Sequence, residues 1–448
     1  MRSNQPEVRL GDFVELLFGF PFKSQDYTDD PNGTRLLRGD NIVQGQLRWD
    51  GVKRWPTTQL GSFETYALRE GDVVLAMDRP WIEAGLKYAC LHRDDLPALL
   101  VQRVARLRGC NGLETSYLRW ILGSPRFTQY VRAVQTGTAV PHISGGQISD
   151  FTFRLPPLSE QRAIAHILGT LDDKIELNRK MNETLDEIAR TLFTSWFVTF
   201  DPVSAKAEGR QPEGMDAETA ALFPDRFVDS ELGPIPEGWH IGRLDKNITV
   251  TKGRSYRSDE LGESPRALVT LKSFLRGGGY REDGLKGFAG TWKPEQVIQS
   301  GEIIVALTDV TQAADVIGGP AIVIPDSKYS TLIGSLDIAI VRPRNGWSNA
   351  FLYGLLGSAS FNHHARSHTT GTTVLHLSAA ALGVFHLAHP PQQLTEAFTL
   401  NIEPLYERVS NGALETRTLA ELRNTLLPEL ISGRLRVPDV EQLIGGAG

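Results

Sequence analysis

The chain has 448 residues, of which 41% are hydrophobic and 22% are charged. These values are ordinary for a folded protein, and the length suits roughly two to four domains of about 100–200 residues each. The formal net charge of −6 argues against a protein that coats nucleic acid without specificity, because such coating needs a cationic surface. Binding through local basic loops is still compatible with this charge.

The first part of the chain, residues 1–156, alternates short apolar runs with turns. The runs at 34–42, 71–77 and 99–107 have the composition of strands, and a helix carries residues 117–127. Strands and helices do not alternate regularly, as they would in a nucleotide-binding sheet. The pattern therefore predicts a mixed α+β domain.

A long helix is predicted for residues 157–199. Two prolines fix an extended entry, and Ser159 is well suited to cap the helix. Apolar residues then recur in steps of three and four, the spacing of a coiled-coil seam, which Asn178 and Asn182 interrupt. Polar residues in a seam lower stability but fix the register, and such a seam needs a partner helix.

The rest of the chain repeats this order. Residues 200–238 are rich in Pro, Gly and acidic residues and predict a partly ordered connector. A second globular domain is predicted for 239–389, a second long helix for 390–433, and a C-terminal tail for 434–448.

The two halves are related by a constant offset. TGTAVPHIS at 136–144 aligns with TGTTVLHLS at 370–378, which is 234 residues later, and the two helices align at the same offset. GDVVLAMD at 71–78 aligns with GEIIVALT at 301–308, an offset of 230 that a small indel on each side explains. The chain is thus predicted to be a tandem duplication whose two helices form an antiparallel coiled coil. The predicted seam consists of Leu168, Leu171, Ile175, Leu185 and Leu192 in the first helix and Ile402, Leu405, Val409, Leu419 and Leu426 in the second.

Catalytic signatures are missing from the sequence. It has neither a GxxxxGK[ST] phosphate loop nor a strand-to-helix GxGxxG, and its Pro-Pro pairs are not part of the Asn/Asp-Pro-Pro-aromatic motif of amino-methyltransferases. His363, His364 and His368 cluster without a cysteine or carboxylate to complete a metal site. We therefore predict no catalytic residues and no bound metal.

Export and disulfide signals are also missing. The N-terminal residues have no apolar segment of signal-peptide length, and no run of about 18 apolar residues occurs. Cys90 and Cys110 could form one disulfide, but two free thiols in a reducing cytoplasm are the favoured interpretation. We expect a cytoplasmic protein.

Three stretches around the first helix resemble the specificity subunit of type I restriction–modification enzymes. They are LPPLSEQRAIAHILGTLDDKIELN at 155–178, SWFVTFDPVSAK at 195–206 and LFPDRFVDSELGPIPEGW at 222–239. With the tandem arrangement, the resemblance covers nearly the whole chain. It departs from the family pattern at the second helix, where HPPQQLTEAF at 389–398 replaces the PPLSEQ form. Contacts at the start of that helix are expected to differ.

The resemblance implies a division of labour. Each globular domain would be a target-recognition domain that reads one half of a bipartite DNA sequence, and the helices would set the spacer. Two methyltransferase subunits would dock on the helices and recognition domains, and motor–nuclease subunits would join them in host defence. Adenine-N6 methylation with S-adenosylmethionine and cleavage with ATP and Mg would belong to those partners. The alternatives are a stand-alone two-headed DNA-binding or scaffold protein and an enzyme with an unrecognised site.

Candidate DNA-binding residues lie in loops that carry Arg, Lys, polar or aromatic side chains. The TGT loops are shared by both copies, so we expect them to contact the DNA backbone or brace the helix junction, because residues that read sequence should differ between copies. The candidates are Lys23, Arg38, Arg79, Trp81, Thr136, Thr138 and His142 in the first domain and Arg254, Tyr256, Arg257, Lys272, Thr308, Lys328, Thr370, Thr372 and His376 in the second.

Overall fold

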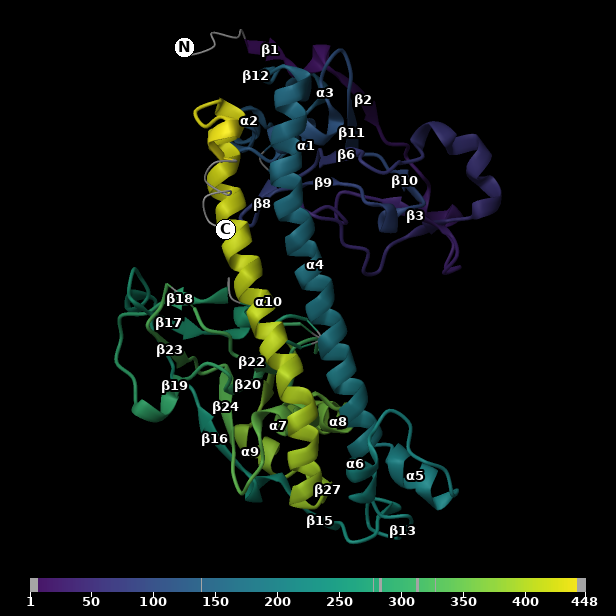
Figure 1. Ribbon diagram of the computed structural model, residues 1–448. Coiled ribbons are helices and arrows are strands. Elements are labelled where there is room, and N and C mark those ends of the chain that lie inside the picture. The colour runs from purple at the N-terminus through teal and green to yellow at the C-terminus, as the bar shows by residue number, and fades with distance from the viewer. Residues whose placement is uncertain are drawn as a thin grey trace. The chain divides into compact units, whose positions relative to one another are not determined.

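The computed structural model describes residues 7–137, 139–276, 278–281, 284–311, 314–326 and 328–440 (Figure 1). Its contacts divide the chain into two compact units. The first unit comprises Met1–Ile175 and Thr418–Gly448, and the second comprises Glu176–Arg417. Each long helix contributes residues to both units, so the division falls within the helices and not at their ends.

The first unit is built on two small sheets with helices packed against them. A five-stranded sheet has the order β2 (Val14–Phe18), β11 (Val104–Gly109), β6 (Val73–Ala76), β9 (Tyr88–Cys90), β4 (Gln44–Gly45). A three-stranded sheet has the order β10 (Ala98–Leu100), β3 (Thr34–Leu37), β5 (Arg54–Trp55). Two further strand pairs are β1 (Glu7–Arg9) with β12 (Thr152–Arg154) and β7 (Trp81–Ile82) with β8 (Gly85–Leu86). The short helices are α1 (Thr115–Leu122), α2 (Pro125–Val134) and α3 (Gly145–Ser149).

The second unit repeats this plan with its own strand lengths. One sheet has the order β16 (Ile248–Lys252), β24 (Ile338–Pro343), β20 (Ile303–Ala306), β22 (Pro320–Ile322). Another has the order β18 (Lys286–Gly287), β17 (Arg266–Val269), β23 (Thr331–Gly334), β19 (Val297–Ile298). β21 (Thr308–Asp309), β26 (Leu375–Leu377) and β25 (Thr369–Thr370) form a third, and β15 (His240–Arg243) pairs with β27 (His386–His389). The short helices here are α7 (Asn349–Gly357), α8 (Ala359–Ser367) and α9 (Ala379–Gly383).

The duplication extends to the strand register. β11 pairs antiparallel with β2 so that Ala105 faces Phe18, and β24 pairs with β16 so that Ala339 faces Lys252. Both partners in the second unit lie 234 residues after those in the first. The 230-residue offset of the middle stretch is also present, because β6 and β20 start at Val73 and Ile303 and pair with equivalent strands.

Two glycines show why some residues recur in both copies. A Cβ atom on Gly19 would lie 2.1 Å from the carbonyl oxygen of Val101, and one on Gly253 would lie 2.1 Å from that of Ser335. Strand ends cross so closely at these points that only glycine fits. The shared Gly19 and Gly253 are therefore explained by backbone packing.

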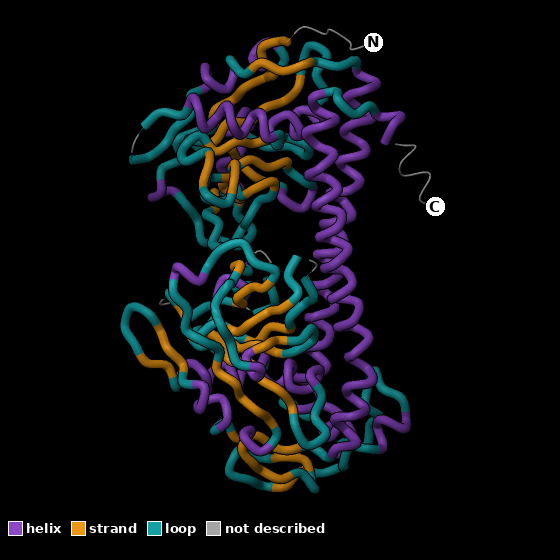
Figure 2. The backbone as a smooth tube through the Cα atoms, turned by 90° about the vertical axis from the view of Figure 1, so that its left-hand side faces the viewer, coloured by secondary structure: helices purple, strands orange, loops and turns teal. Residues whose placement is uncertain are grey.

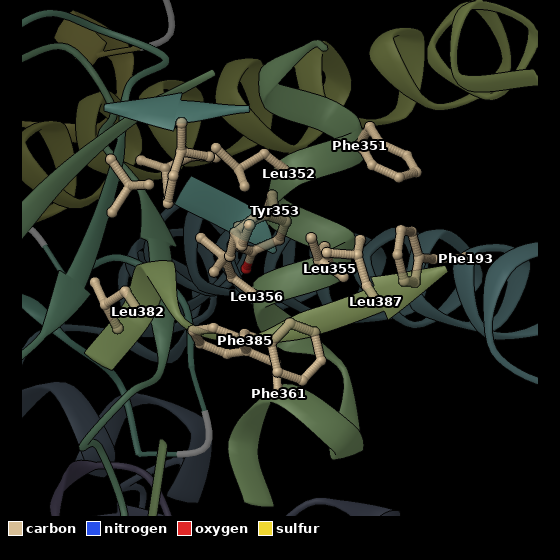
Figure 3. Close-up of a cluster of buried hydrophobic side chains, with 14 of the residues drawn as sticks. Phe193, Phe351, Leu352, Tyr353, Leu355, Leu356, Phe361, Leu382, Phe385 and Leu387 are labelled. Carbon is tan, nitrogen blue, oxygen red and sulfur yellow. The ribbon is translucent and has the colours of Figure 1, made fainter. Parts of the chain in front are cut away.

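The globular part of the second unit packs against the first long helix through a shared apolar core (Figure 3). Phe193 projects from this helix toward Leu355 of α7 and Leu387 of β27. The close approach depends on Gly354, because a Cβ atom there would lie 2.4 Å from the Phe193 ring.

The long helices are α4 (Leu158–Phe197) and α10 (Gln392–Ser432), of 40 and 41 residues. Each begins and ends within two residues of its predicted bounds. Within each unit they run side by side in opposite directions (Figure 2). In the second unit the Asn178 amide donates to Glu415 (2.9 Å) and that of Asn182 to the Val409 carbonyl (3.1 Å). In the first unit Arg423 donates to Asp172 (2.5 Å).

The predicted seam residues turn toward the protein interior. Leu168, Ile402 and Leu426 are buried, and Asn178 is fully buried among them. The other predicted seam residues are half-buried: Leu171, Ile175, Leu185, Leu192, Leu405, Val409 and Leu419. The polar interruption therefore lies inside the helix pair, where the antiparallel register places Glu415 opposite Asn178.

The connector is more ordered than the sequence suggests. It contains α5 (Asp201–Ala207), α6 (Ala217–Ala221) and a pair of short strands, β13 (Phe227–Val228) and β14 (Ile235–Pro236). Phe223 is buried against Trp196 at the end of α4, with ring centroids 5.3 Å apart, and the Lys206 ammonium donates to the Ala220 carbonyl (3.1 Å). These short elements are held because apolar anchors spaced through the polar segment pack onto the helix end.

The start of the C-terminal tail packs in the same way. Val440 is buried in the core of the first unit, and Leu435 and Val437 pack against that core. Residues 441–448 lie outside the described part of the chain. Cys90 and Cys110 are both free thiols. Among the described helices, none is long and apolar enough to cross a membrane.

Candidate nucleic-acid interface

Each unit carries a partly buried ion pair that belongs to the scaffold. Arg108 of β11 donates to Asp72 (2.5 Å), and Arg342 of β24 donates to Glu302 (2.5 Å). The hydrogen bond that Arg108 donates to Asp72 raises the pKa of Arg108. The two pairs occupy equivalent positions, so they stabilise the common sheet and do not distinguish one unit from the other.

The TGT loops are held against the same sheets. Thr136 and His142 exchange backbone hydrogen bonds of 2.8 and 2.7 Å, and the next residue, Ile143, donates to the Met77 carbonyl (2.9 Å). In the second unit Thr370 pairs with His376, and Leu377 donates to the Leu307 carbonyl (2.8 Å).

These contacts suit the bracing role expected for the TGT loops. Thr136, Thr370, Thr372 and His376 are exposed. Thr138 lies outside the described residues.

The first unit gathers basic side chains around the end of β6. Arg79 is exposed, adopts a φ of +46° and donates its backbone N–H to the Pro141 carbonyl (2.6 Å), which ties it to the TGT loop. His142 is hydrogen-bonded to Asp78 (2.7 Å), and Arg103 lies 3.7 Å from the same carboxylate. Lys87, which is half-buried, lies near these side chains.

The groups that act on the pKa of Lys87 lie around the same edge. Burial lowers the pKa of Lys87, and the charges of Arg79 and Arg48 lower it further, while Asp40 and Asp78 oppose this. Arg38 lies 3.4 Å from Asp40. We call this group of five cations the basic cluster: Arg38, Arg48, Arg79, Lys87 and Arg103. Five cations outnumber the two carboxylates, so the edge attracts anions.

Other candidates of the first unit are less available. Arg132 lies over the ring of Trp81, 4.4 Å from its centroid, so this face of the indole is covered. Lys23 is exposed just before a short 3-10 helix, Ser24–Asp26. Sequence reasoning identified Arg38 and Arg79 and missed Arg48, Lys87 and Arg103, because only the strand pairing brings them to the same edge.

The same edge of the second unit has the opposite chemistry. Asp309 occupies the position equivalent to Arg79. Asp337 is equivalent to Arg103, and Gly319 is equivalent to Lys87. The backbone shows the last correspondence, since the Ala76 N–H donates to the Lys87 carbonyl (3.0 Å) and the Ala306 N–H to that of Gly319 (3.2 Å).

The carboxylates of this edge are fixed by hydrogen bonds. Burial alone would raise the pKa of Asp309, but the backbone N–H groups of Val316 and Thr311 hold it below its ordinary value. Thr308 was predicted to contact DNA, but it is buried and donates its hydroxyl to Asp337 (3.1 Å). Its side chain is therefore not presented at the surface.

Basic residues of the second unit gather instead on the sheet formed by β17 and its neighbours. Three cations lie over aromatic rings: Arg254 is 5.2 Å from the centroid of Phe288, Arg266 is 4.7 Å from Trp292 and Lys286 is 5.7 Å from Tyr256. The three rings pack around one small apolar cluster, so they form one patch. We call it the aromatic–basic patch: Arg254, Tyr256, Arg266, Lys286, Phe288 and Trp292.

The candidates of the second unit are thus divided. Arg254 is engaged by Glu260 (2.8 Å), while Arg257, Lys272 and Lys328 are exposed. Sequence reasoning missed Arg266, Lys286 and Trp292, which a search for cations and aromatics on adjacent strands would have found.

The histidines of α8 are engaged in local structure. His364 bonds the Ala381 carbonyl (2.8 Å), and His368 bonds the carbonyl of His364 (2.8 Å). No group of three or more metal-binding side chains occurs among the described residues.

The chain is thus a tandem duplication of one α+β scaffold in which each copy is followed by a long helix and carries different charged residues. Residues 4–187 match the family model described as the type I restriction modification DNA specificity domain. The chain is 37% identical over 186 residues to the specificity subunit of type I restriction enzyme EcoAI from Escherichia coli, a match that covers 41% of this chain and 30% of that one.

A second relative is matched along its whole length. The chain is 24% identical over 485 residues to the specificity subunit of type I restriction enzyme HindI from Haemophilus influenzae, covering 97% of this chain and 100% of that one. The crystal structure of a type I restriction–modification S subunit from M. genitalium has the same fold, with a TM-score of 0.55 and 14% identity over 96% of this chain and 97% of that one. The chain is therefore similar along most of its length to type I restriction enzyme specificity subunits, and residues 4–187 match their DNA specificity domain.

Proposed function

We propose that this chain is the DNA-specificity subunit of a type I restriction–modification system, and that each unit reads one half of a bipartite target. One observation carries the proposal. Two copies of a scaffold with the same strand register differ in side chain at equivalent positions: exposed Arg103 corresponds to half-buried Asp337, and exposed Arg79 corresponds to buried Asp309. A pair of readers for two different half-sites needs this combination of constant scaffold and variable edge.

The first unit would bind through its basic cluster. Arginine and lysine bind phosphate oxygens and donate to the O6 and N7 atoms of guanine. Arg79 is the best placed for this role because its backbone is fixed to the TGT loop while its side chain is exposed. His142 would position Asp78, which in turn orients Arg103.

The second unit would bind through its aromatic–basic patch and through the edge that carries Asp309 and Asp337, the carboxylate edge. Carboxylates accept hydrogen bonds from the exocyclic amine of cytosine, so half-buried Asp337 suits a base edge rather than a phosphate. Lys286 and Arg266 would supply the phosphate contacts. The two half-sites should accordingly differ in sequence.

The outer faces of the long helices would dock two methyltransferase subunits. Thr184, Glu187, Ile188 and Thr191 on α4 are exposed, and so are Thr418, Glu421, Leu422 and Thr425 on α10, each 234 residues later. Ile188 is 44% exposed and Leu422 is 41% exposed, so no packing within the described chain accounts for the recurrence. A surface that occurs twice suits one kind of partner that binds twice.

The chain itself would perform no catalytic step. In the assembled enzyme, which we place in the cytoplasm, the methyltransferase subunits would use S-adenosylmethionine to methylate adenine at N6. Motor–nuclease subunits would add ATP- and Mg-dependent translocation and cleavage. A stand-alone two-headed DNA-binding protein is the competing hypothesis, and the recruitment of methyltransferase subunits separates the two.

The test is to express the chain with the methyltransferase subunit of its own genome in a host without other adenine methylation. Sequencing of modified bases should show one bipartite motif with a methylated adenine in each half. Arg79→Ala with Lys87→Ala should weaken DNA binding by the complex about tenfold or more, because each removes a charged contact. The matched control is Arg226→Ala, an exposed arginine of the connector, which should leave binding unchanged. Absence of a complex, or methylation without a bipartite motif, would refute the proposal.

A further inference from the structure

The edge that carries the basic cluster in the first unit has a different outward-facing residue in the second. After β6, Arg79 is exposed and Pro80 is buried. The equivalent residues after β20 are Asp309 and Val310, 230 residues later, and here Asp309 is buried while Val310 is 71% exposed. The outward position has moved along the chain by one residue, and an apolar side chain occupies it in place of a cation.

The backbone conformation accounts for this shift. Arg79 adopts a φ of +46°, in the left-handed region, so the chain turns sharply at this residue. Asp309 instead belongs to β21 and pairs with Leu375 of β26. Successive side chains of a strand point to opposite faces, so the inward direction of Asp309 leaves Val310 pointing outward.

The Asp309 carboxylate fixes the turn that presents Val310. One of its oxygens accepts from the N–H and from the hydroxyl of Thr311 (2.8 Å each), and the other accepts from the N–H of Val316 (2.8 Å). These hydrogen bonds engage both oxygens, so the carboxylate supports the turn from within. Val310 is therefore held in place in the free protein, and a preorganised contact loses little conformational freedom on binding.

A second apolar side chain follows the same pattern. Leu336 is 42% exposed in the turn between β23 and β24, where the first unit has the exposed Gln102. This turn lies beside the start of β21, because the Leu307 N–H donates to the Asp337 carbonyl (2.8 Å) and the Thr308 hydroxyl donates to the Asp337 carboxylate (3.1 Å). At both places an exposed polar side chain of the first unit is replaced by an exposed apolar one in the second.

The chemistry of these two side chains limits what they can recognise in DNA. A single exposed apolar residue is common on protein surfaces, but here two occupy the positions of polar side chains in the other copy. Apolar side chains neither donate nor accept hydrogen bonds. The only apolar group that a base edge presents in the major groove is the C5 methyl group of thymine. An apolar side chain on a DNA-reading edge therefore distinguishes base pairs through this methyl group.

We propose that Val310 is a specificity-determining residue of the second unit, and that it contacts the C5 methyl group of a thymine in the half-site of this unit, with Leu336 beside it. The contact selects an A·T pair and also its orientation, because the methyl group belongs to one strand only. This inference rests on the DNA-reading function proposed above and deepens it, since it names a base that the second unit selects.

Deoxyuridine tests the contact, because it lacks the C5 methyl group of thymidine and keeps every hydrogen-bonding group. The complex of the chain with its methyltransferase subunits is titrated with duplexes that carry the motif found by sequencing of modified bases. Each duplex has one thymine replaced by uracil. At a position in one half-site the dissociation constant should rise roughly fourfold, the ratio expected when one methyl group is no longer buried.

Val310→Ala should abolish this ratio at the same position, because the shortened side chain no longer reaches the methyl group. The matched control is Leu232→Ala, which truncates an exposed apolar residue of the connector and should keep the ratio. Val310 and Leu232 are 71% and 52% exposed, so neither substitution removes core packing. The inference is overturned if no thymine shows the effect, or if the Val310→Ala complex retains it.

Failure of this inference and failure of the DNA-reading function are distinguishable. Absence of a bipartite methylated motif refutes the function proposed above. A bipartite motif that is bound equally well with thymine and with uracil at every position leaves that function intact and overturns the assignment of Val310 alone.

Discussion

Lengthening both helices by one turn should lengthen the unspecified spacer of the DNA target. The site for this change follows from the polar contacts in the centre of the helix pair. Asn178 is bound to Glu415, while Asn182 is bound to Val409 and lies so close to Gly412 that a Cβ atom there would be 2.5 Å from its oxygen. Four residues inserted after Asn178, together with four after Ala413, keep each of these contacts and place the new turns opposite one another.

The expected size of the effect comes from helix geometry. Four residues add about 6 Å at 1.5 Å per residue and about 1.1 turns, so the seam stays on nearly the same face. At about 3.4 Å per base pair, the spacer should grow by one or two base pairs. The methylated adenines of a host genome that carries the partner subunits report both the spacer and the half-sites.

A matched control uses the same contacts. Four residues inserted into α4 alone separate Asn178 from Asn182 without a matching turn in α10, so one of the two contacts with α10 must break. This variant should lose stability and methylation. The reasoning is refuted if the paired insertion leaves the spacer unchanged, or if it changes the bases read at either end.

Three further predictions follow from packing and from the division into units. Leu168→Ala, at a fully buried position, should lower the free energy of unfolding by about 2–5 kcal/mol, while Leu177→Ala, at a position 58% exposed on the same helix, should change it little; equal denaturation midpoints would contradict the seam. Gly253→Ala should prevent correct folding because of the nearby Ser335 carbonyl, whereas Gly262→Ala, with no atom within 4 Å of the added Cβ, should fold normally, as circular dichroism would show. Exchange of residues 1–150 for the same domain of a relative should alter one half-site in the methylation pattern and leave the other half-site and the spacer unchanged; an effect on both half-sites would contradict it.

The helices could be located from the sequence because their signals are local. A proline pair fixes the entry, and an apolar period of three and four continues to the end, so both predicted ranges agree with α4 and α10 within two residues. The duplication was visible for the same reason, since equal offsets need no knowledge of contacts. The departure at HPPQQLTEAF was also visible, but the hydrogen bond of the Thr395 hydroxyl to the Gln392 carbonyl could be seen only in the structure.

The recognition surfaces were harder to predict, because the presence of a suitable side chain in the sequence does not show which neighbouring residues it contacts. Arg254 and Trp81 have the right side chains, yet Glu260 engages the first and Arg132 covers the second. Lys87 and Arg103 were not among the predicted DNA-binding residues, because they come from separate strands that meet only when the sheet forms. The short elements of the connector depend on a tertiary contact as well, the burial of Phe223 against Trp196.

The two copies separate the residues that hold the fold from those that vary on its surface. The positions that recur with one role are close approaches and buried contacts, such as Gly19 and Gly253 or the pairs of Arg108 and Arg342. None of these is part of the basic cluster or of the carboxylate edge. Replacing an exposed charge, such as that of Arg79 or Arg103, leaves the scaffold contacts intact and costs little stability, because exposed ion pairs contribute about 0–1 kcal/mol. A protein built this way can acquire a new DNA target at one edge while its fold, its helices and its docking surfaces stay the same.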